Sequence, residues 1–278
     1  MPTLKEIKGR IASVRGTLKI TSAMKLVSSA KLRKAQKATE AMRPYEAKLQ
    51  EMLAAVGMTT PSGATLPSDA VKVPAAIIAI ASNSSLCGGF NANAVAKVRS
   101  VRQGDDVVYS IGRKMADAMR RDGFPSLEDF SALSEHPAYA PAAALVERLQ
   151  QDLAEGRISR VLLVYNHFVS TARQVPVVEE LLASAGPTNA MPTQADAIFE
   201  PSRMELLAAL EPKLLKLKLY AALLDSAAAE HAARTVAMQT ATDNGEKLLQ
   251  ELTLQYNKGR QQKITSEILD LAGGQATQ

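Results

Sequence analysis

The chain has few of the features that mark a secreted or a membrane-spanning protein. Its 278 residues include one cysteine, Cys87, so an internal disulfide is excluded, which suits a reducing cytoplasm. No apolar run approaches the roughly 18 residues that a spanning helix needs, and lysine and arginine interrupt the first turns, so no signal peptide is expected. Tryptophan is absent and aromatic residues make up only 4%, which fits a fold rich in alanine and leucine helices.

Proline is absent after Pro212, so roughly the last seventy residues can form one long helix. Apolar and small residues recur there in alternating steps of three and four, the heptad pattern of a coiled-coil helix. These positions are Leu207, Leu210, Leu214, Leu217, Ala221, Leu224, Ala228, His231, Thr235, Met238, Thr242, Gly245, Leu249, Leu252 and Tyr256. A helix from Ser202 to Gly274 would be on the order of 100 Å long, so most of it should lie outside a globular domain.

A second long helix is expected over about residues 3–57, with a capping box made by Thr3 and Glu6 and a kink near Pro44. Its expected apolar face consists of Leu4, Ile7, Ile11, Val14 and Leu18, followed by Met24, Val27, Ala30, Ala35, Ala38 and Tyr45. Two long helices at opposite ends of a chain pair most simply as an antiparallel coiled coil.

The positive charge of the chain is concentrated in this first helix. Residues 1–57 hold twelve Lys and Arg against four Glu, a net +8, whereas the rest of the chain carries −3 of the total +5. The basic face could be a solvated helix surface, a surface for nucleic acid or anionic membrane, or a surface that meets acidic protein loops. No aromatic residues alternate with these charges, which weakens the case for single-stranded nucleic acid.

An α/β domain is expected between the two helices. Strands are predicted over 74–81, 106–111, 160–168 and 172–180, and helices over 91–102, 113–121 and 140–155. This alternation predicts a Rossmann-like parallel sheet, with Pro176 placing the last strand at an edge. The expected division is an N-terminal coiled-coil helix (1–57), a turn-rich linker (58–72), a central α/β domain (73–201) and a C-terminal coiled-coil helix (202–278).

No constellation of catalytic residues is apparent in the sequence. The turn Ser85–Asn91 (SLCGGFN) lies between a strand and a helix, where α/β proteins hold phosphates, yet it matches no nucleotide-binding motif. Cys87 would need a nearby base to act as a nucleophile, so a small half-buried residue is the simpler interpretation. The three histidines lack metal-ligand spacing. We therefore expect neither catalysis nor a cofactor or metal. A nucleotide-binding enzyme and a basic coiled-coil protein for nucleic acid or anionic membrane stay open as alternatives.

Three stretches of the chain resemble the F-type ATP synthase gamma subunit of the bacterial type. They are Ile7–Gln36 (IKGRIASVRGTLKITSAMKLVSSAKLRKAQ), Leu86–Asn91 (LCGGFN) and Glu230–Gly274 (EHAARTVAMQTATDNGEKLLQELTLQYNKGRQQKITSEILDLAGG). The resemblance implies a non-catalytic rotor shaft, with its coiled coil inside a ring of three alpha and three beta subunits. It places the α/β domain beside the epsilon subunit, on the membrane ring of c subunits.

In this family, proton flow turns the shaft, and the turning shaft drives ATP synthesis on the beta subunits. The resemblance therefore implies a location on the cytoplasmic side of the bacterial inner membrane. The chain is expected to associate with the membrane through the complex only, and to bind no nucleic acid.

The resemblance also implies which residues meet the beta subunits. The expected contacts are Arg260, Gln261 and Thr265, then Met24 and Lys25 on the facing helix, then Leu86, Cys87 and Gly88 in the loop. The apolar residues Ile264, Ile268, Leu269 and Leu271 are expected to form a bearing at the tip.

The chain departs from the family pattern at three places. Asn83, Ser84 and Ser85 replace Asp-Arg-Gly, which removes a salt-bridging arginine from the loop. Gln239 replaces a lysine, which removes one charge beside the seam. Gly259 replaces an alanine, which should soften the helix by up to about 1 kcal/mol.

Overall fold

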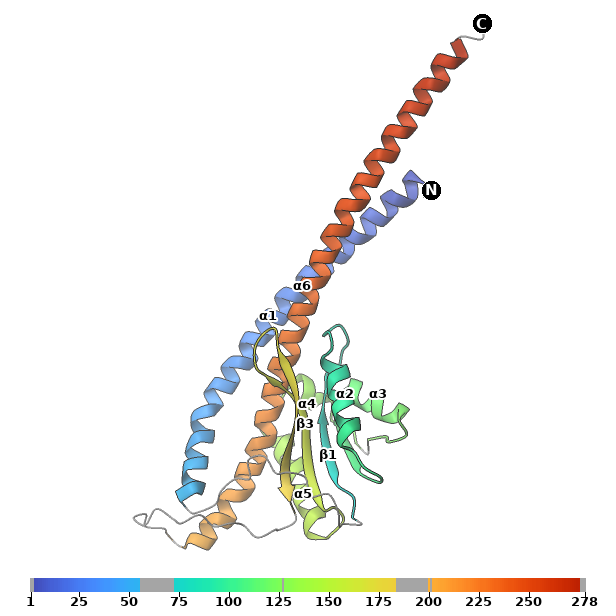
Figure 1. Ribbon diagram of the computed structural model, residues 1–278. Helices are drawn as coiled ribbons and strands as arrows, with labels where there is room; N and C mark the ends of the chain where they lie inside the picture. Colours follow the sequence, from blue (N-terminus) through green and yellow to red (C-terminus); the bar gives the residue numbers. More distant parts are fainter. Residues whose placement is uncertain (1–2, 56–72, 127, 184–199, 201, 276–278) are drawn as a thin grey trace. The chain divides into compact units, whose positions relative to one another are not determined.

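The computed structural model describes residues 3–55, 73–126, 128–183, 200 and 202–275, and the chain forms two compact units. One unit consists of Met1–Ser28 with Thr235–Gln278, and the other of Ser29–Arg234. The long helices α1 (Leu4–Ala55) and α6 (Arg203–Gln275) contribute to both units, which confirms the two predicted helices (Figure 1). The linker 58–72 lies outside the described residues, and the fourfold division of the chain stays a prediction.

A four-stranded sheet in the order β2-β1-β3-β4 forms the centre of the unit Ser29–Arg234. The strands are β1 (Ala76–Ile80), β2 (Val107–Ile111), β3 (Arg160–Phe168) and β4 (Gln174–Ala183). β1 pairs in parallel with β2 and β3, whereas β4 pairs antiparallel with β3, so the predicted parallel sheet carries one antiparallel strand at its edge. Residues 169–173 form a hairpin connection, which is too short for the crossover that parallel strands need. Pro176 lies on the edge strand β4, as predicted.

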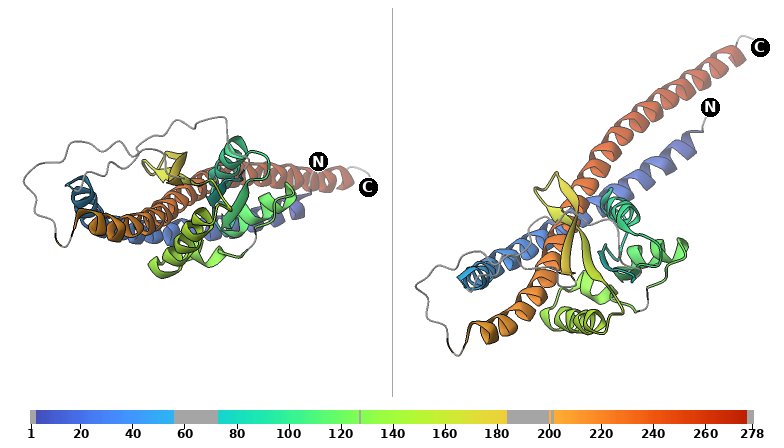
Figure 2. Two further views of the ribbon diagram at one scale, coloured as in Figure 1. Left: turned by 90° about the horizontal axis from the view of Figure 1, so that it is seen from below. Right: turned by 60° about the horizontal axis from the view of Figure 1, so that its bottom comes forward.

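Helices cover both faces of this sheet (Figures 1 and 2). They are α2 (Phe90–Val101), α3 (Arg113–Arg121), the short α4 (Ser131–Glu135), which the sequence did not predict, α5 (Tyr139–Ala154) and part of α6. Ile77 and Ala79 pack with α2 and α3, whereas Ile78 and Ile80 pack with α5 and α6. Because successive strand residues face opposite sides, this double burial accounts for the continuous apolar sequence of β1.

Within the same unit, α1 and α6 run antiparallel to each other. A cluster of leucines joins the end of α1 to the first turns of α6: Leu49, Leu53, Leu210, Leu214 and Leu217. Leu32, further back along α1, packs against Ala228 and Ala232, further forward along α6. The predicted antiparallel pairing is therefore confirmed, with small alanine side chains providing room for the leucine.

The antiparallel pairing is also present in the unit of Met1–Ser28 with Thr235–Gln278. Leu18 lies opposite Gly245, and Leu4 lies opposite Gly259. Most side chains between the predicted seam positions of α6 are exposed here. The seam positions themselves are buried or half-buried: Thr235, Met238, Thr242, Gly245, Leu249, Leu252 and Tyr256. The heptad pattern thus identified the paired side of α6 correctly.

The apolar face predicted for α1 is right as far as Leu18 and only partly right beyond it, where Met24, Ala35 and Ala38 are half-buried but Val27, Ala30 and Tyr45 are exposed. Thr21, Ser28 and Leu32 are buried, whereas Val27 and Tyr45 are each 57% exposed. Helical periodicity explains the difference, because steps of three and four from Leu18 lead to Thr21 and Ser28. Polar residues therefore occupy some seam positions of α1, and several apolar residues lie on its outer side.

The start of α1 has the predicted capping box. The Thr3 N–H donates to Glu6 Oε2 at 2.9 Å, and the Glu6 N–H donates to Thr3 Oγ1 at 3.3 Å. Pro44 lies inside α1, and the helix continues beyond it to Ala55. Among the described residues, no helix combines the length and the apolar character that a membrane span requires.

Candidate partner-contact surfaces

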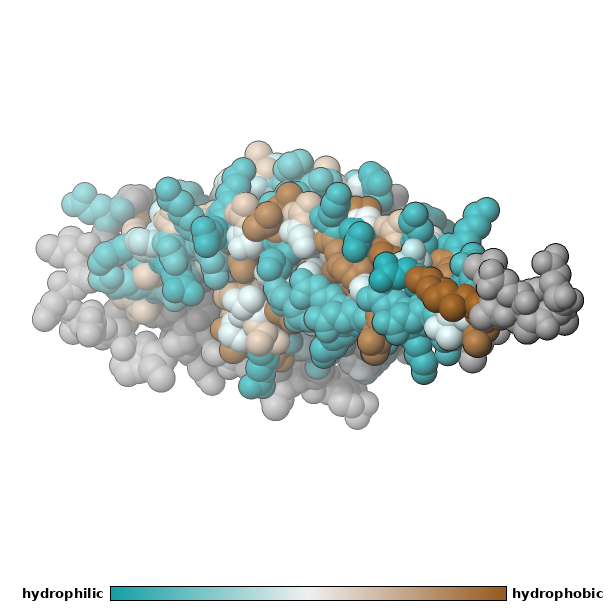
Figure 3. Space-filling view, turned by 90° about the horizontal axis from the view of Figure 1, so that it is seen from above, coloured by the Kyte–Doolittle hydropathy of each residue, from teal (hydrophilic) through white to brown (hydrophobic). Residues whose placement is uncertain are grey.

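The last described turns of α6 extend beyond the start of α1. The side chain of Leu4 lies opposite Gly259, and every described side chain from Arg260 to Leu269 is exposed. Ile264, Ile268 and Leu269 are 46%, 59% and 65% exposed, and apolar surface is visible at this end of the molecule in Figure 3. The side chain of Leu271 lies outside the described residues. Apolar side chains on a bare helix favour a contact with another protein.

The first residues of this bare segment are polar and are predicted to contact a partner. Arg260 and Gln261 are both exposed, and together they offer several hydrogen-bond donors at one level of the helix. Thr265 is also exposed, and its hydroxyl donates to the Gln261 carbonyl at 2.9 Å. The structure thus brings Arg260, Gln261 and Thr265 together on one accessible stretch.

Gly259 allows a close approach of α1 at the boundary of this segment. An added Cβ would lie 3.1 Å from Leu4 Cδ2, which is tighter than an ordinary contact. Gly259 therefore makes room for Leu4, which an alanine at this position would crowd.

Met24 and Lys25 are half-buried on α1, beside the seam. Lys25 Nζ donates to Gln239 Oε1 at 2.7 Å, and Gln239 Nε2 donates to Asp243 Oδ1 at 2.6 Å. A lysine at position 239 could not accept this bond. Gln239 therefore joins the two helices by a hydrogen bond, where a lysine would place two like charges side by side.

An apolar patch on α1, missed in the sequence, flanks these two residues. Ile20, Leu26 and Val27 are 62%, 68% and 57% exposed. The sequence pattern places Val27 on the paired face of α1, and for this reason it does not reveal the patch. Together with Met24, these side chains give α1 an accessible apolar surface of its own.

The loop after β1 holds Leu86 in an unusual conformation. Leu86 has φ +67°, the one positive φ of a non-glycine residue in the described part of the chain, and its side chain is 59% exposed. Gly88 is also exposed, with φ +58°. Cys87 between them is only 1% exposed and packs with Phe90, Ala229 and Ala233, so it is more deeply buried than the sequence suggested.

Hydrogen bonds within the loop fix its shape. Ser82 Oγ donates to the Ser84 carbonyl at 2.6 Å, and Asn91 Oδ1 accepts from the Ser82 N–H at 3.0 Å. Asn91 Nδ2 lies 3.2 Å from Cys87 Sγ, and Asn83 Nδ2 donates to the Ser131 carbonyl at 2.9 Å. These polar groups are therefore engaged within the turn or with α4, which weakens the alternative of a phosphate-binding loop.

The loop is also bonded to α6 through a residue that the sequence analysis did not identify. Arg234 Nη1 donates to the Ser85 carbonyl at 2.5 Å, and Nη2 donates to Ser84 Oγ at 3.0 Å. Nη2 also pairs with Glu230 Oε1 at 2.6 Å. Burial raises the pKa of the Glu230 carboxyl, and Arg234 opposes this effect. About 150 residues separate Arg234 from the loop, so no local pattern could have linked them.

Two histidines lie on or against α6 within the same unit. His167 Nδ1 lies 2.6 Å from Asp225 Oδ2, which connects the end of β3 to α6. Burial raises the pKa of Asp225, and the hydrogen bond to His167 lowers it. Burial, together with the positive charges of Lys31 and Arg234, lowers the pKa of His231 to about 4. His231 is therefore neutral at physiological pH.

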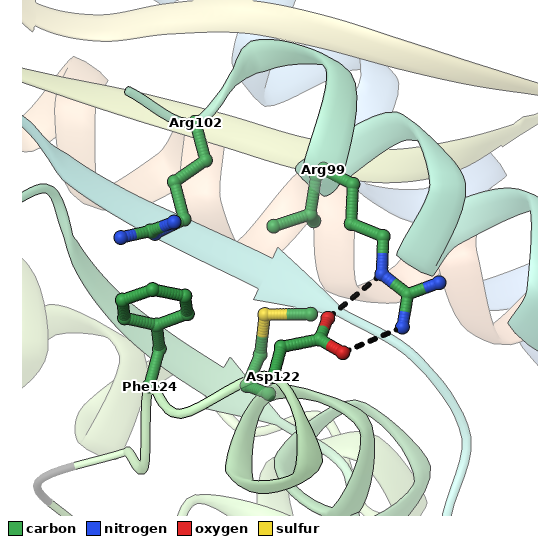
Figure 4. Close-up of a pocket in the computed structure, with 6 residues that line it drawn as sticks. Arg99, Arg102, Asp122 and Phe124 are labelled. Carbon is green, nitrogen blue, oxygen red and sulfur yellow. Dashed lines mark hydrogen bonds and ion pairs between the residues drawn. The ribbon is translucent and has the colours of Figure 1, made fainter. Parts of the chain in front are cut away.

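A hollow of about 250 Å³ lies between the ends of α2 and α3 (Figure 4). Arg99 forms a bidentate pair with Asp122, at 2.7 and 2.8 Å, and the Arg102 guanidinium stacks on Phe124. The hollow lies at the opposite end of α2 from the loop. Nor do the described residues contain a group of three His, Cys, Asp or Glu side chains that could hold a metal.

Comparisons with known proteins agree with this geometry. A family model described as ATP synthase matches residues 3–277. The chain is 45% identical over 284 residues to the ATP synthase gamma chain of Parabacteroides distasonis, with 99% of each protein covered. It is 40% identical over 283 residues to the ATP synthase gamma chain of Flavobacterium johnsoniae, covering 99% of this chain and 98% of that protein.

Solved structures with a similar fold come from assembled ATP synthases. A chain of the Euglena gracilis mitochondrial ATP synthase, in an OSCP/F1/c-ring structure, matches with a TM-score of 0.73 at 20% identity, covering 99% of this chain and 94% of that chain. A chain of the Tetrahymena thermophila central stalk and c-ring matches with a TM-score of 0.58 at 25% identity, covering 80% of this chain and 99% of that chain.

Proposed function

Because the chain belongs to the ATP synthase gamma chain family, we propose that it is the rotating shaft of the enzyme's central stalk. It is a subunit of an F-type ATP synthase. In our proposal, proton flow through the c-ring turns the shaft, and the turning shaft changes the conformation of catalytic sites on the beta subunits. The chain itself supplies no catalytic residue and holds no cofactor.

One observation carries this proposal: α6 continues beyond its antiparallel partner as a bare helix. Every described side chain from Arg260 to Leu269 is exposed, and three of the large apolar ones are 46–65% exposed. In an isolated helix, exposure of these apolar side chains to water is unfavourable. Inside a ring of alpha and beta subunits, the apolar side chains would act as a bearing, since contacts of this kind have little directional preference.

The polar groups of the same region would meet the beta subunits. Arg260 can form bidentate hydrogen bonds with carboxylates, and such bonds can break and reform as the shaft turns. Met24 and Lys25 would lie near the same subunits, and the loop with Leu86 and Gly88 would touch them from below. Cys87 would support this loop from inside, because its side chain is buried.

The remaining partners would be the epsilon subunit and the c-ring, both reached through the α/β domain. The chain would be a peripheral protein on the cytoplasmic side of the bacterial inner membrane, held there by the complex. The basic residues of α1 would face acidic protein segments, and nucleic acid would not be a partner.

The proposal is tested by the double substitution of Arg260→Ala and Gln261→Ala in the assembled enzyme. Inverted membrane vesicles from the host allow ATP hydrolysis and ATP-driven proton pumping to be measured on the same sample. Loss of about 1 kcal/mol of contact would lower the ratio of pumping to hydrolysis by roughly fivefold.

Lys263→Ala is the matched control, because Lys263 lies on the same bare segment and pairs with Glu267 at 3.6 Å. This variant should keep the normal ratio. If the double variant also kept the normal ratio in fully assembled enzyme, Arg260 and Gln261 would have no part in coupling.

A further inference from the structure

Glu230 and Arg234 form a buried ion pair whose role reaches beyond α6. Their side chains are 12% and 8% exposed, and the closest oxygen and nitrogen atoms are 2.6 Å apart. The free energy needed to remove two charges from water can exceed the free energy gained from their attraction. Stability alone is therefore a weak explanation for a buried ion pair. The hydrogen bonds of Arg234 show what the pair holds in place.

Arg234 makes three contacts at once with its planar guanidinium. Nη1 donates to the Ser85 carbonyl at 2.5 Å, and Nη2 lies 3.0 Å from Ser84 Oγ and 2.6 Å from Glu230 Oε1. Glu230 lies one helical turn before Arg234 and fixes the direction of the guanidinium. The two residues thus bind the loop to α6 immediately before Leu86.

Leu86 combines a strained backbone with an exposed apolar side chain. Its backbone is in the left-handed region, with φ +67°, which costs free energy for a leucine. Its side chain is nevertheless 59% exposed, so burial of Leu86 does not offset this cost. The surrounding bonds must hold the strained conformation, and they lie on both sides of Leu86: Arg234 bonds to the two residues before it, and Asn91 Nδ2 lies 3.2 Å from Cys87 Sγ after it.

We propose that Glu230 and Arg234 are positioning residues that clamp the loop of residues 84–89 onto α6 and present Leu86 as a rigid apolar anchor. The clamp makes the loop and the part of α6 around Arg234 move as one body. A partner that pushes on Leu86 therefore pushes on this part of α6. The identity of the partner as a beta subunit rests on the proposed function, whereas the clamp itself does not.

Cys87 provides a direct measure of the clamp. It is the single cysteine of the chain, it follows Leu86, and it is 1% exposed beneath the loop. Alkylation of its thiol requires the loop to open. The rate of N-ethylmaleimide labelling of the Cys87 peptide, followed by mass spectrometry in the assembled enzyme, therefore reports on loop opening.

Arg234→Lys keeps the charge but loses the fork that serves three acceptors. We expect this variant, and Glu230→Gln, to raise the labelling rate about tenfold, which corresponds to about 1.4 kcal/mol. Ser84→Ala removes one acceptor and keeps the ion pair, so a rise of about threefold is expected from loss of one hydrogen bond. Arg99→Lys is the matched control, since Arg99 forms a bidentate pair with Asp122 at the other end of α2 and should not affect Cys87.

The clamp would be overturned if both Ser84→Ala and the assembled Arg234→Lys enzyme were labelled at rates within twofold of the wild-type rate. If Arg234→Lys fails to assemble, Ser84→Ala decides the matter alone. Leu86→Ala separates the two proposals, because it should lower the ratio of proton pumping to hydrolysis. Normal pumping in Leu86→Ala with fast labelling in Arg234→Lys would keep the clamp and remove the role of Leu86 in coupling.

Discussion

A buried pair of threonines joins α1 to α6 and allows a quantitative test of the seam. Thr21 and Thr242 are each 8% exposed, and their hydroxyl oxygens lie 2.9 Å apart. Each hydroxyl also lies within reach of a carbonyl of its own helix, 3.1 Å to Leu18 for Thr21 and 2.9 Å to Met238 for Thr242. One hydroxyl therefore donates across the seam while the other donates within its helix.

Replacing one threonine by valine should destabilise the pairing. The bond across the seam is lost, at about 1 kcal/mol, and the remaining hydroxyl keeps a buried oxygen without its former partner, at about 1 kcal/mol more. The new methyl group recovers about 0.8 kcal/mol through its burial. We therefore expect Thr21→Val or Thr242→Val alone to cost about 1 kcal/mol.

The double variant should be less unstable than the two single variants suggest. With both hydroxyls gone, no buried oxygen lacks its partner, and two methyl groups contribute about 1.6 kcal/mol. The double variant should thus be about as stable as the wild type, and because each single variant costs about 1 kcal/mol, the interaction energy of the cycle should be about 2–3 kcal/mol in magnitude.

Hydrogen exchange followed by mass spectrometry measures this locally in the complete chain. Peptides that contain Thr21 or Thr242 should exchange about fivefold faster in each single variant, and near the wild-type rate in the double variant. Thr17→Val is the control, because Thr17 is exposed and donates only to the Ser13 carbonyl at 3.2 Å. Additive effects of the two substitutions, within about 0.5 kcal/mol, would refute the reasoning.

Two further predictions concern the unit Ser29–Arg234. Gly112→Ala should lower the free energy of thermal unfolding by at least about 3 kcal/mol, because Gly112 has φ +101° and a Cβ would lie 2.1 Å from the Ala81 carbonyl oxygen. Gly104→Ala is the control and should cost only about 1 kcal/mol, because Gly104 has φ +41° and open space around it. Equal losses in the two variants would contradict the steric argument. For His231, the folded pKa of about 4 lies below the unfolded value near 6.5, so the unfolded chain binds the extra proton and stability should fall as the pH drops from about 6.5 to 4. The loss should be below about 3 kcal/mol, since the side chain is partly exposed, and His231→Gln should flatten the pH dependence of the melting temperature; an unchanged slope would exclude this histidine as its cause.

The parts of the fold that periodicity controls could be predicted from the sequence. The heptad steps located the paired side of α6 as far as Tyr256, and the apolar run of β1 indicated burial on both faces. The apolar pattern of α1 misplaced Val27 and Tyr45, because the polar residues Thr21 and Ser28 occupy seam positions that spacing alone identifies. The direction of β4 was missed because strand patterns carry no direction, which the hairpin connection decides.

The candidate surfaces were only partly accessible to sequence reasoning. The resemblance assigned Arg260 and Ile264 to the tip, and both side chains are exposed where α6 extends beyond the start of α1. The clamp could not be found, because Arg234 and Ser85 are far apart in sequence and the bond depends on tertiary packing. Nor could the strained backbone of Leu86 be foreseen, since leucine has no preference for positive φ.

The contact between α1 and α6 contains one cluster made of leucines and one segment with a threonine pair and a glycine, and this difference affects stiffness as well as stability. Leucines such as Leu53 and Leu214 fill the contact near the end of α1, whereas Thr242 and Gly245 occupy it closer to the tip. Small side chains make fewer dispersion contacts, so the restoring force against a relative twist of the helices is smaller there. A torsional load on α6 would therefore be taken up as elastic strain in the threonine and glycine segment, while the leucine segment turns almost as a solid piece.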